Sequence, residues 1–130
     1  MARLLLLLPT TSYRVKDFMA AAEKADVVVT VGSDAENVLN EFKSPGTLCV
    51  NFENLEEGVK AILDFNQEHP LTSIIAVDEP SSLLAAKASE KLGLSNNSFE
   101  SVRTATNKSL FREVIKDAGL PGPMFKVLTP

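Results

Sequence analysis

Two short segments carry the residue types best suited to hold a small charged molecule. The first is PTTSYR, in which Thr10, Thr11 and Ser12 stand where a helix is expected to begin and Arg14 follows closely. Backbone N–H groups at a helix N-terminus and a guanidinium group both suit a carboxylate or phosphate. The segment therefore predicts an anion site, although ordinary helix capping beside a solvated arginine would use the same residues.

The second segment is VDEPSS, which places Asp78 and Glu79 between an apolar run and a helix start. One interpretation is that a carboxylate here binds an amine or hydroxyl group of a substrate. The other is structural, because an acidic side chain near a helix N-terminus stabilises the helix by about 0.3–1 kcal/mol. Successive residues of an extended segment point in opposite directions, so the two carboxylates are not expected in one site without a bend.

Several common chemistries are missing from the sequence. The first loop contains no glycine, so a dinucleotide-binding G-x-G-x-x-G is absent, and G-x-x-x-x-G-K-[ST] is absent as well. Cys49 and His69 are the sole residues of their types. A disulfide framework and a cysteine-based metal site are therefore excluded within the chain. We find no pairing of a nucleophile with a base and no cluster of metal ligands, so no catalytic residue is assigned.

Composition and charge indicate one folded domain. The 130 residues are 45% hydrophobic and 23% charged, with a formal net charge of −4. An acidic chain without a basic cluster gives no electrostatic footprint for nucleic acid. The leucine run Leu4–Leu8 is shorter than the apolar region of a signal peptide and far shorter than a membrane span. We therefore expect a cytoplasmic protein with no nucleic-acid or membrane partner.

Strand-like and helix-like segments alternate along most of the chain. Buried strands are predicted at Leu4–Leu8, Asp26–Val31, Thr47–Asn51 and Thr72–Val77. Helices are predicted at Ser12–Ala25, at Ala35–Phe42, after a cap at Asn54, and at Pro80–Leu92. This alternation is typical of a parallel sheet covered by helices on both faces.

The C-terminal part departs from that rhythm. A polar passage follows Gly93, and we expect a single short helical turn in it around Phe99–Val102. A helix is predicted at Lys108–Ala118, ended by Gly119 in a left-handed conformation. The last segment, PMFKVLT, has the pattern of a strand without an evident partner.

The stretch VDEPSSLLAAKASEKLGLSNNSFESVRTATNKSLFREVIKDAGLPGPMF resembles ATP-grasp enzymes, in the region where the pre-ATP-grasp domain meets the nucleotide-binding domains. The resemblance rests on an acidic strand end, a helix finishing in Leu-Gly-Leu, a lysine followed by an arginine, and a Gly-Leu-Pro-x-Pro segment. These features correspond to Asp78–Glu79, Leu92–Leu94, Lys108, Arg112 and Gly119–Pro123. The opening LLLLPTTSYRVKDFMAAAEKADVVVTV also resembles the carboxylate–amine ligases and carbamoyl-phosphate-synthase-like members.

The resemblance implies a Rossmann-like, three-layer α/β/α pre-ATP-grasp domain at residues 1–103. Its mainly parallel sheet would have four or more strands. Residues 104–130 would form a connecting helix and strand that lead into an ATP-grasp domain. The implied activity is an ATP-dependent ligase reaction in which a carboxylate becomes an acylphosphate and an amine or similar nucleophile displaces phosphate. ATP and Mg²⁺ are the implied cofactors of the intact enzyme.

The family also implies residue roles. Thr10, Thr11, Ser12, Arg14 and Glu79 would face the substrates, and Lys108 would reach the nucleotide. The further ATP-grasp domains do not occur in these 130 residues. We therefore expect the isolated chain to bind no cofactor, to be inactive, and to require those domains as partners.

Other interpretations stay open. The alternative function is a non-catalytic Rossmann-like module that binds or interacts through its last strand, and a homodimer is possible for either function. A receiver-type signalling domain fits less well, because PTT stands where acidic residues should follow the first strand.

Overall fold

The centre of the protein is a parallel sheet of four strands. The computed structural model describes residues 1–9, 14–34 and 46–129. The strands run in the order β3-β2-β1-β4, and every pair is parallel. Their bounds are Arg3–Leu7 for β1, Val28–Ser33 for β2, Thr47–Cys49 for β3 and Ser73–Ala76 for β4. All four predicted strands and their parallel pairing are confirmed.

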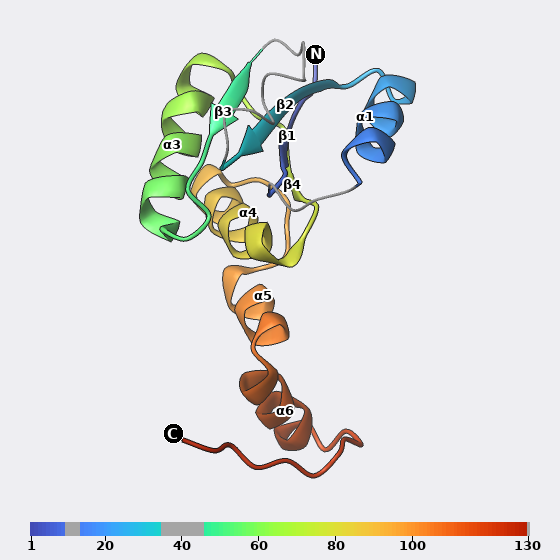
Figure 1. The fold of residues 1–130 in the computed structure, drawn as a ribbon, viewed down its shortest axis with the longest axis vertical. Coiled ribbons are helices and arrows are strands. Elements are labelled where there is room, and N and C mark those ends of the chain that lie inside the picture. Colours follow the sequence, from blue (N-terminus) through green and yellow to red (C-terminus); the bar gives the residue numbers. More distant parts are fainter. Residues whose placement is uncertain (10–13, 35–45, 130) are drawn as a thin grey trace.

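Helices cover both faces of this sheet (Figure 1). Because side chains alternate along a strand, Leu5 and Leu7 of β1 enter one core, whereas Leu6 and Leu8 enter another. The helix α1 (Val15–Lys24) covers the second core, and α3 (Leu55–Glu68) with α4 (Glu79–Leu92) covers the first. The predicted three-layer α/β/α arrangement is confirmed. The predicted helix at Ala35–Phe42 and the first residues of the predicted Ser12–Ala25 helix lie outside the described residues.

Local signals explain where α3 and α4 begin and end. The Asn54 side chain accepts a hydrogen bond from the backbone N–H of Glu57, as predicted, but the Glu57 carboxylate accepts one from Asn51 rather than returning to the cap. Gly93 ends α4 with φ of 66°, a left-handed conformation that glycine adopts without strain.

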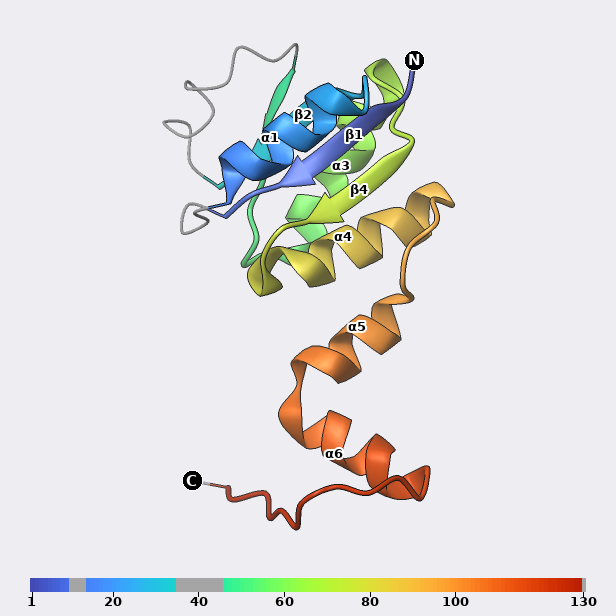
Figure 2. The same cartoon turned by 90° about the vertical axis from the view of Figure 1, so that its right-hand side faces the viewer.

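Two further helices carry the chain away from the sheet (Figure 2). They are α5 (Phe99–Thr106) and α6 (Lys108–Asp117). The expectation of a single turn around Phe99–Val102 was too short, because Ser98 caps a full helix by accepting from the Ser101 N–H. Gly119 has φ of 68° and the Leu120 N–H returns to the Ile115 carbonyl, so the predicted end of α6 is confirmed.

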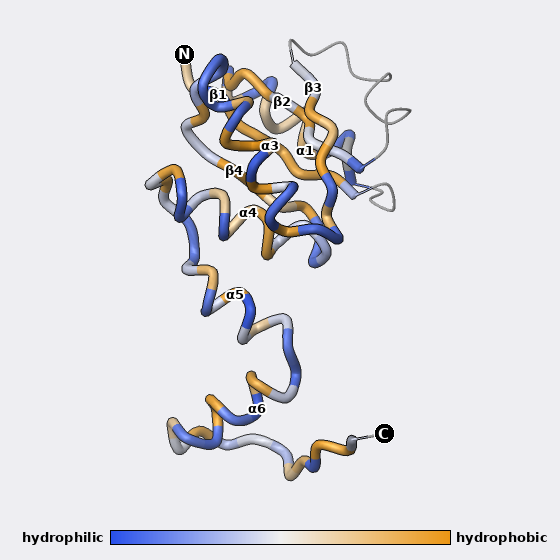
Figure 3. Tube along the Cα trace, turned by 90° about the vertical axis from the view of Figure 1, so that its left-hand side faces the viewer, coloured by the Kyte–Doolittle hydropathy of each residue, from blue (hydrophilic) through white to orange (hydrophobic). Residues whose placement is uncertain are grey.

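The predicted final strand PMFKVLT is wrong, because residues 123–129 form no regular element. A strand needs a neighbouring strand for its backbone N–H and carbonyl groups, and no described strand pairs with this segment. Its apolar side chains are instead exposed, and Figure 3 shows hydrophobic positions near the C-terminus as well as in the strands. Among the described residues, no helix has the length and apolar character needed to span a bilayer.

Candidate functional site

The topology of the sheet selects one edge as the place for a ligand. The chain leaves β1 toward α1 on one face and leaves β4 toward α4 on the other. In open α/β sheets, ligands bind beyond the carboxyl ends of the strands where the connections diverge in this way. The Val77 N–H donates to the Leu7 carbonyl at 3.2 Å, so these two strand ends lie side by side. Both segments selected from the sequence follow these strands.

The loop after β1 is described only in part. Thr10, Thr11 and Ser12 lie outside the described residues, so their anion-binding role stays a prediction. Arg14 is the residue that precedes α1, and its side chain makes no capping hydrogen bond. The Arg14 Nε lies 3.7 Å from the Asp17 carboxylate, and both side chains are exposed. Such surface ion pairs contribute about 0–1 kcal/mol, so the guanidinium could turn to an anionic ligand at small cost.

The loop after β4 is fixed by a buried serine. The fully buried Ser81 hydroxyl lies 2.9 Å from the Asp78 carbonyl, to which it donates, and 3.5 Å from the Leu7 carbonyl. The contact with the Leu7 carbonyl holds the first turn of α4 against the end of β1. It therefore holds Glu79, the first residue of α4, beside the carboxyl edge of the sheet.

An open cleft of about 610 Å³, lined by both polar and apolar side chains, separates the start of α4 from α5. Its lining residues are Glu79, Ser82, Asn97, Ser101, Val102, Ala105 and Thr106. The hydroxyl groups of the cleft already donate to backbone carbonyls. The Glu79 carboxylate has no side-chain partner in the described part of the chain and remains free to accept hydrogen bonds. The cleft therefore suits a ligand that carries an amine or several hydroxyl groups.

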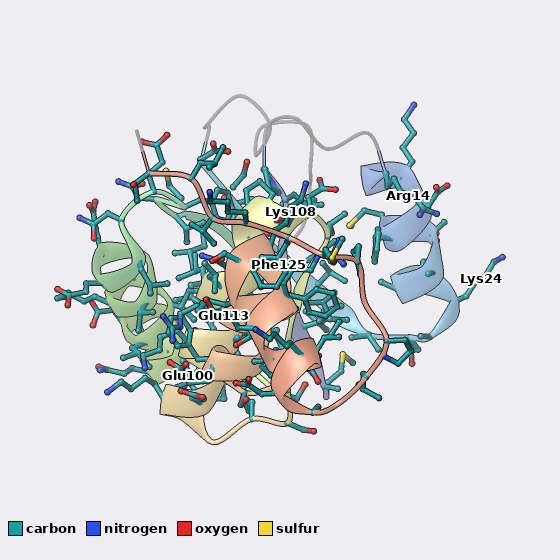
Figure 4. All side chains as sticks on the ribbon, turned by 90° about the horizontal axis from the view of Figure 1, so that it is seen from below. Arg14, Lys24, Glu100, Lys108, Glu113 and Phe125 are labelled. Carbon is teal, nitrogen blue, oxygen red and sulfur yellow. The ribbon has the colours of Figure 1, made fainter. Side chains whose placement is uncertain are left out.

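Lys108 begins α6, two residues beyond the cleft residue Thr106. Its side chain is exposed, and no carboxylate in the described ranges forms an ion pair with it. A cation in the first turn of a helix is opposed by the helix dipole, so an anionic ligand would relieve an unfavourable interaction there. Figure 4 shows Lys108 at the start of α6, with Glu113 further along that helix and Glu100 on α5.

The cleft thus contains Glu79, whereas Lys108 lies two residues beyond the cleft residue Thr106 and Arg14 lies at the start of the separate helix α1. Sequence analysis missed the part of the cleft wall formed by Asn97 and α5. The available signal was Ser98, a good N-cap residue, with Glu100 in the first turn and Arg103 in the last, a charge order that favours a helix.

A second hollow, of about 430 Å³, lies at the ends of β2 and β3 and includes Asp34, Asn51, Glu53 and Glu57. Here Asn51 organises the loop, because its side-chain oxygen accepts from the N–H groups of Glu53 and Asn54. No group of three or more acidic, cysteine or histidine side chains in the described residues could hold a metal ion.

Comparisons with known proteins identify two solved structures that are similar to this one. No family model and no curated protein sequence matches the chain. An L-amino acid ligase from Bacillus licheniformis has a similar structure, with a TM-score of 0.78 and 20% identity over 100% of this chain. A phosphoribosylglycinamide synthetase from Anaerococcus prevotii matches 91% of the chain, with a TM-score of 0.73 and 17% identity.

The chain spans 36% and 29% of the lengths of these two proteins. Identities this low establish a likeness of fold. This likeness of fold agrees with the resemblance stated from the sequence. The chain therefore shares its fold with one part of an L-amino acid ligase and one part of a phosphoribosylglycinamide synthetase.

Proposed function

We propose that this chain is the N-terminal, substrate-side domain of an ATP-dependent ligase that activates a carboxylate as an acylphosphate for attack by an amine or similar nucleophile. In this account residues 1–103 form the pre-ATP-grasp domain and residues 104–130 lead into an ATP-grasp domain. The proposed boundary falls within α5. We also propose a cytoplasmic location, in line with a leucine run whose side chains are buried in the core around the sheet.

One observation carries this proposal. The likeness to the L-amino acid ligase covers 100% of the chain, so it includes α5, α6 and the segment beyond them. A Rossmann-like sheet alone hosts many unrelated functions. The two-helix arm that follows the sheet is a much more specific feature, and it is the element that carries Lys108.

The residues divide between two ligand chemistries. Thr10, Thr11, Ser12 and Arg14 would bind an anionic group of the carboxylate substrate, and Glu79 would bind the amine. Lys108 would contact a phosphate group of ATP, to which an exposed ammonium is well suited. Mg²⁺, when bound, neutralises charge on the transferring phosphoryl group. No group of three or more potential metal ligands lies among the described residues, and we assign the ligands of this ion to the further domains.

The exposed apolar surface of the arm supports the presence of those domains in the intact enzyme. The exposed residues are Phe111, Val114, Leu120, Met124, Phe125, Val127 and Leu128. Many exposed apolar side chains within one short segment are typical of an interface. The shares of 36% and 29% leave room for partner domains of the same polypeptide.

Hydroxylamine trapping tests the reaction class without knowledge of the natural nucleophile. The polypeptide encoded by the complete reading frame would be incubated with ATP, Mg²⁺, hydroxylamine and a panel of carboxylic acids that includes amino acids. We expect one acid to give its hydroxamate together with an equal amount of ADP, because hydroxylamine intercepts an acylphosphate. Formation of AMP would contradict the proposal, because it indicates an acyl-adenylate.

Absence of both nucleotides with every acid would favour the alternative, a non-catalytic binding or interaction module. The same assay on residues 1–130 alone should release no ADP. ADP release by that piece would contradict the assignment of the catalytic centre to further domains.

A further inference from the structure

Asn107 is the single residue that separates α5 from α6. Its N–H donates to the Arg103 carbonyl at 3.2 Å and thereby completes α5. Its carbonyl accepts from the Phe111 N–H at 2.9 Å and thereby starts α6. Between these bonds the backbone is extended, with φ of −104° and ψ of 108°. The two helices therefore meet at a bend one residue long, which is visible in Figure 2.

The Asn107 side chain stabilises this bend. Its Oδ1 accepts hydrogen bonds from the N–H groups of Ser109 and Leu110, each at 3.1 Å. In a continuous helix these two N–H groups would donate to the carbonyls four residues earlier, at Ala105 and Thr106. The side chain thus replaces the backbone acceptors that the bend removes.

Nothing else in the local sequence opposes a continuous helix. Residues 99–118 contain neither glycine nor proline, and a change in φ and ψ of Asn107 alone would join the helical residues on either side. A straight helix would gain backbone hydrogen bonds and lose the side-chain cap and the packing of α5 against α6. The choice between the bent and straight forms therefore depends on the chemistry of residue 107.

The bend matters because α5 is anchored to α4 at its start and borders the cleft at its end. At its start, the Phe99 N–H donates to the Glu90 carboxylate at 2.8 Å, and the Lys87 ammonium lies 4.7 Å from the Phe99 ring centre. At its end, Thr106 lines the same cleft as Glu79. With α5 held in this way, the conformation of Asn107 sets the direction in which α6 leaves the cleft.

We propose that Asn107 is a positioning residue, whose side chain fixes the α5–α6 bend and thereby keeps Lys108 beside the cleft that contains Glu79. The bend itself follows from the geometry of this chain. Its consequence for catalysis rests on the proposed role of Lys108 at the nucleotide.

A spin-label distance measurement tests the bend. In a Cys49→Ser background, labels at Glu100→Cys and Lys116→Cys report the separation across Asn107. A continuous helix would place these Cα atoms about 24 Å apart, because each residue adds about 1.5 Å. We expect a shorter separation with Asn107, a shift toward the straight-helix value in Asn107→Ala, and the original separation in Asn107→Asp, which retains an N-cap acceptor.

An unchanged separation in Asn107→Ala would overturn the proposal. A broad distribution would also overturn it, since the proposal requires both helices to persist in the variant. A lengthened separation in Asn107→Asp would show that the side-chain acceptor is not what fixes the bend.

Kinetics of the intact ligase test the consequence for catalysis. We expect Asn107→Ala to raise KM for ATP roughly tenfold with a smaller change in kcat, and Asn107→Asp to restore KM. A changed spin-label distance with an unchanged KM would overturn the positioning role. If the wild-type polypeptide shows no ATP-dependent reaction, the proposed function fails, and the spin-label distances still decide whether Asn107 fixes the bend.

Discussion

At the scale of single residues, Glu79 has the environment expected of a ligand-binding carboxylate. It is exposed at the start of α4, it lines the cleft between α4 and α5, and no side chain of the described ranges pairs with it. The buried Ser81 hydroxyl fixes the backbone on which it stands.

We predict that Glu79→Gln raises KM for the amine substrate of the intact ligase by roughly tenfold or more, because a hydrogen bond to a charged group contributes about 1.5–3 kcal/mol. KM for ATP should change little. The measurement is steady-state kinetics with each substrate varied in turn. Glu68→Gln, at the far end of α3, is the matched control and should leave both values unchanged. An equal effect of the two substitutions would remove Glu79 from the site.

Gly58 shows how one residue sets the packing of two helices. A Cβ atom at this position would lie 2.8 Å from the Asn51 carbonyl oxygen and 2.9 Å from the Leu84 side chain. Glycine therefore allows α3 to lie close against both the loop after β3 and the helix α4.

We predict that Gly58→Ala lowers the free energy of unfolding by about 1–3 kcal/mol, since the clash exceeds the gain in helix propensity. Urea denaturation of residues 1–130 measures the change. Gln67→Ala, at an exposed position of the same helix, should stay within about 0.5 kcal/mol. A stabilised Gly58→Ala variant would show that the close approach is not needed.

At the scale of elements, the sequence predicted the strands and helices that have a regular apolar period. It did not predict the features that depend on tertiary contacts. The four strands and the helices α3, α4 and α6 follow from apolar periodicity, capping residues and glycine stops, all of which are local. The length of α5 depends on the Ser98 cap and on contacts of Phe99 with α4. The last segment has the apolar pattern of a strand but no strand to pair with, so its pattern alone was misleading.

The candidate site, like the elements, could be predicted from the sequence only in part. The strand-end segments were identified because parallel strands place their carboxyl ends together. The cleft was not, because its second wall comes from Asn97 and α5, which meet α4 only through tertiary contacts. Asn107 was missed for a related reason: its role depends on a bend between two helices, and periodicity does not reveal a bend.

The start of α3 gives an element-scale prediction. We predict that Asn54→Ala lowers the free energy of unfolding by about 1 kcal/mol, because the Glu57 N–H loses its side-chain acceptor. Asn54→Asp should restore most of that loss, since aspartate caps equally well and interacts favourably with the helix dipole. Thermal or urea denaturation distinguishes the two variants, and equal destabilisation by both would exclude capping as the cause.

At the scale of the whole molecule, the protein consists of a well-buried sheet domain and an exposed two-helix arm (Figure 1). The sheet domain has two apolar cores, whereas α5 and α6 contain no fully buried residue. An arm of this kind gains stability when further surface packs on it. In the proposed ligase, that surface also carries most of the nucleotide site.

The most direct test of this account is ATP binding by the polypeptide encoded by the complete reading frame. Titration calorimetry in the presence of Mg²⁺ would compare the wild type with the variants Lys108→Met and Lys116→Met. Lys116 lies in the last turn of α6 and is exposed like Lys108, which makes it a matched control. The account predicts saturable binding by wild type and Lys116→Met, and binding weakened roughly tenfold or more in Lys108→Met through loss of a charge-assisted contact. Absence of ATP binding, or equal affinity of all three proteins, would contradict it.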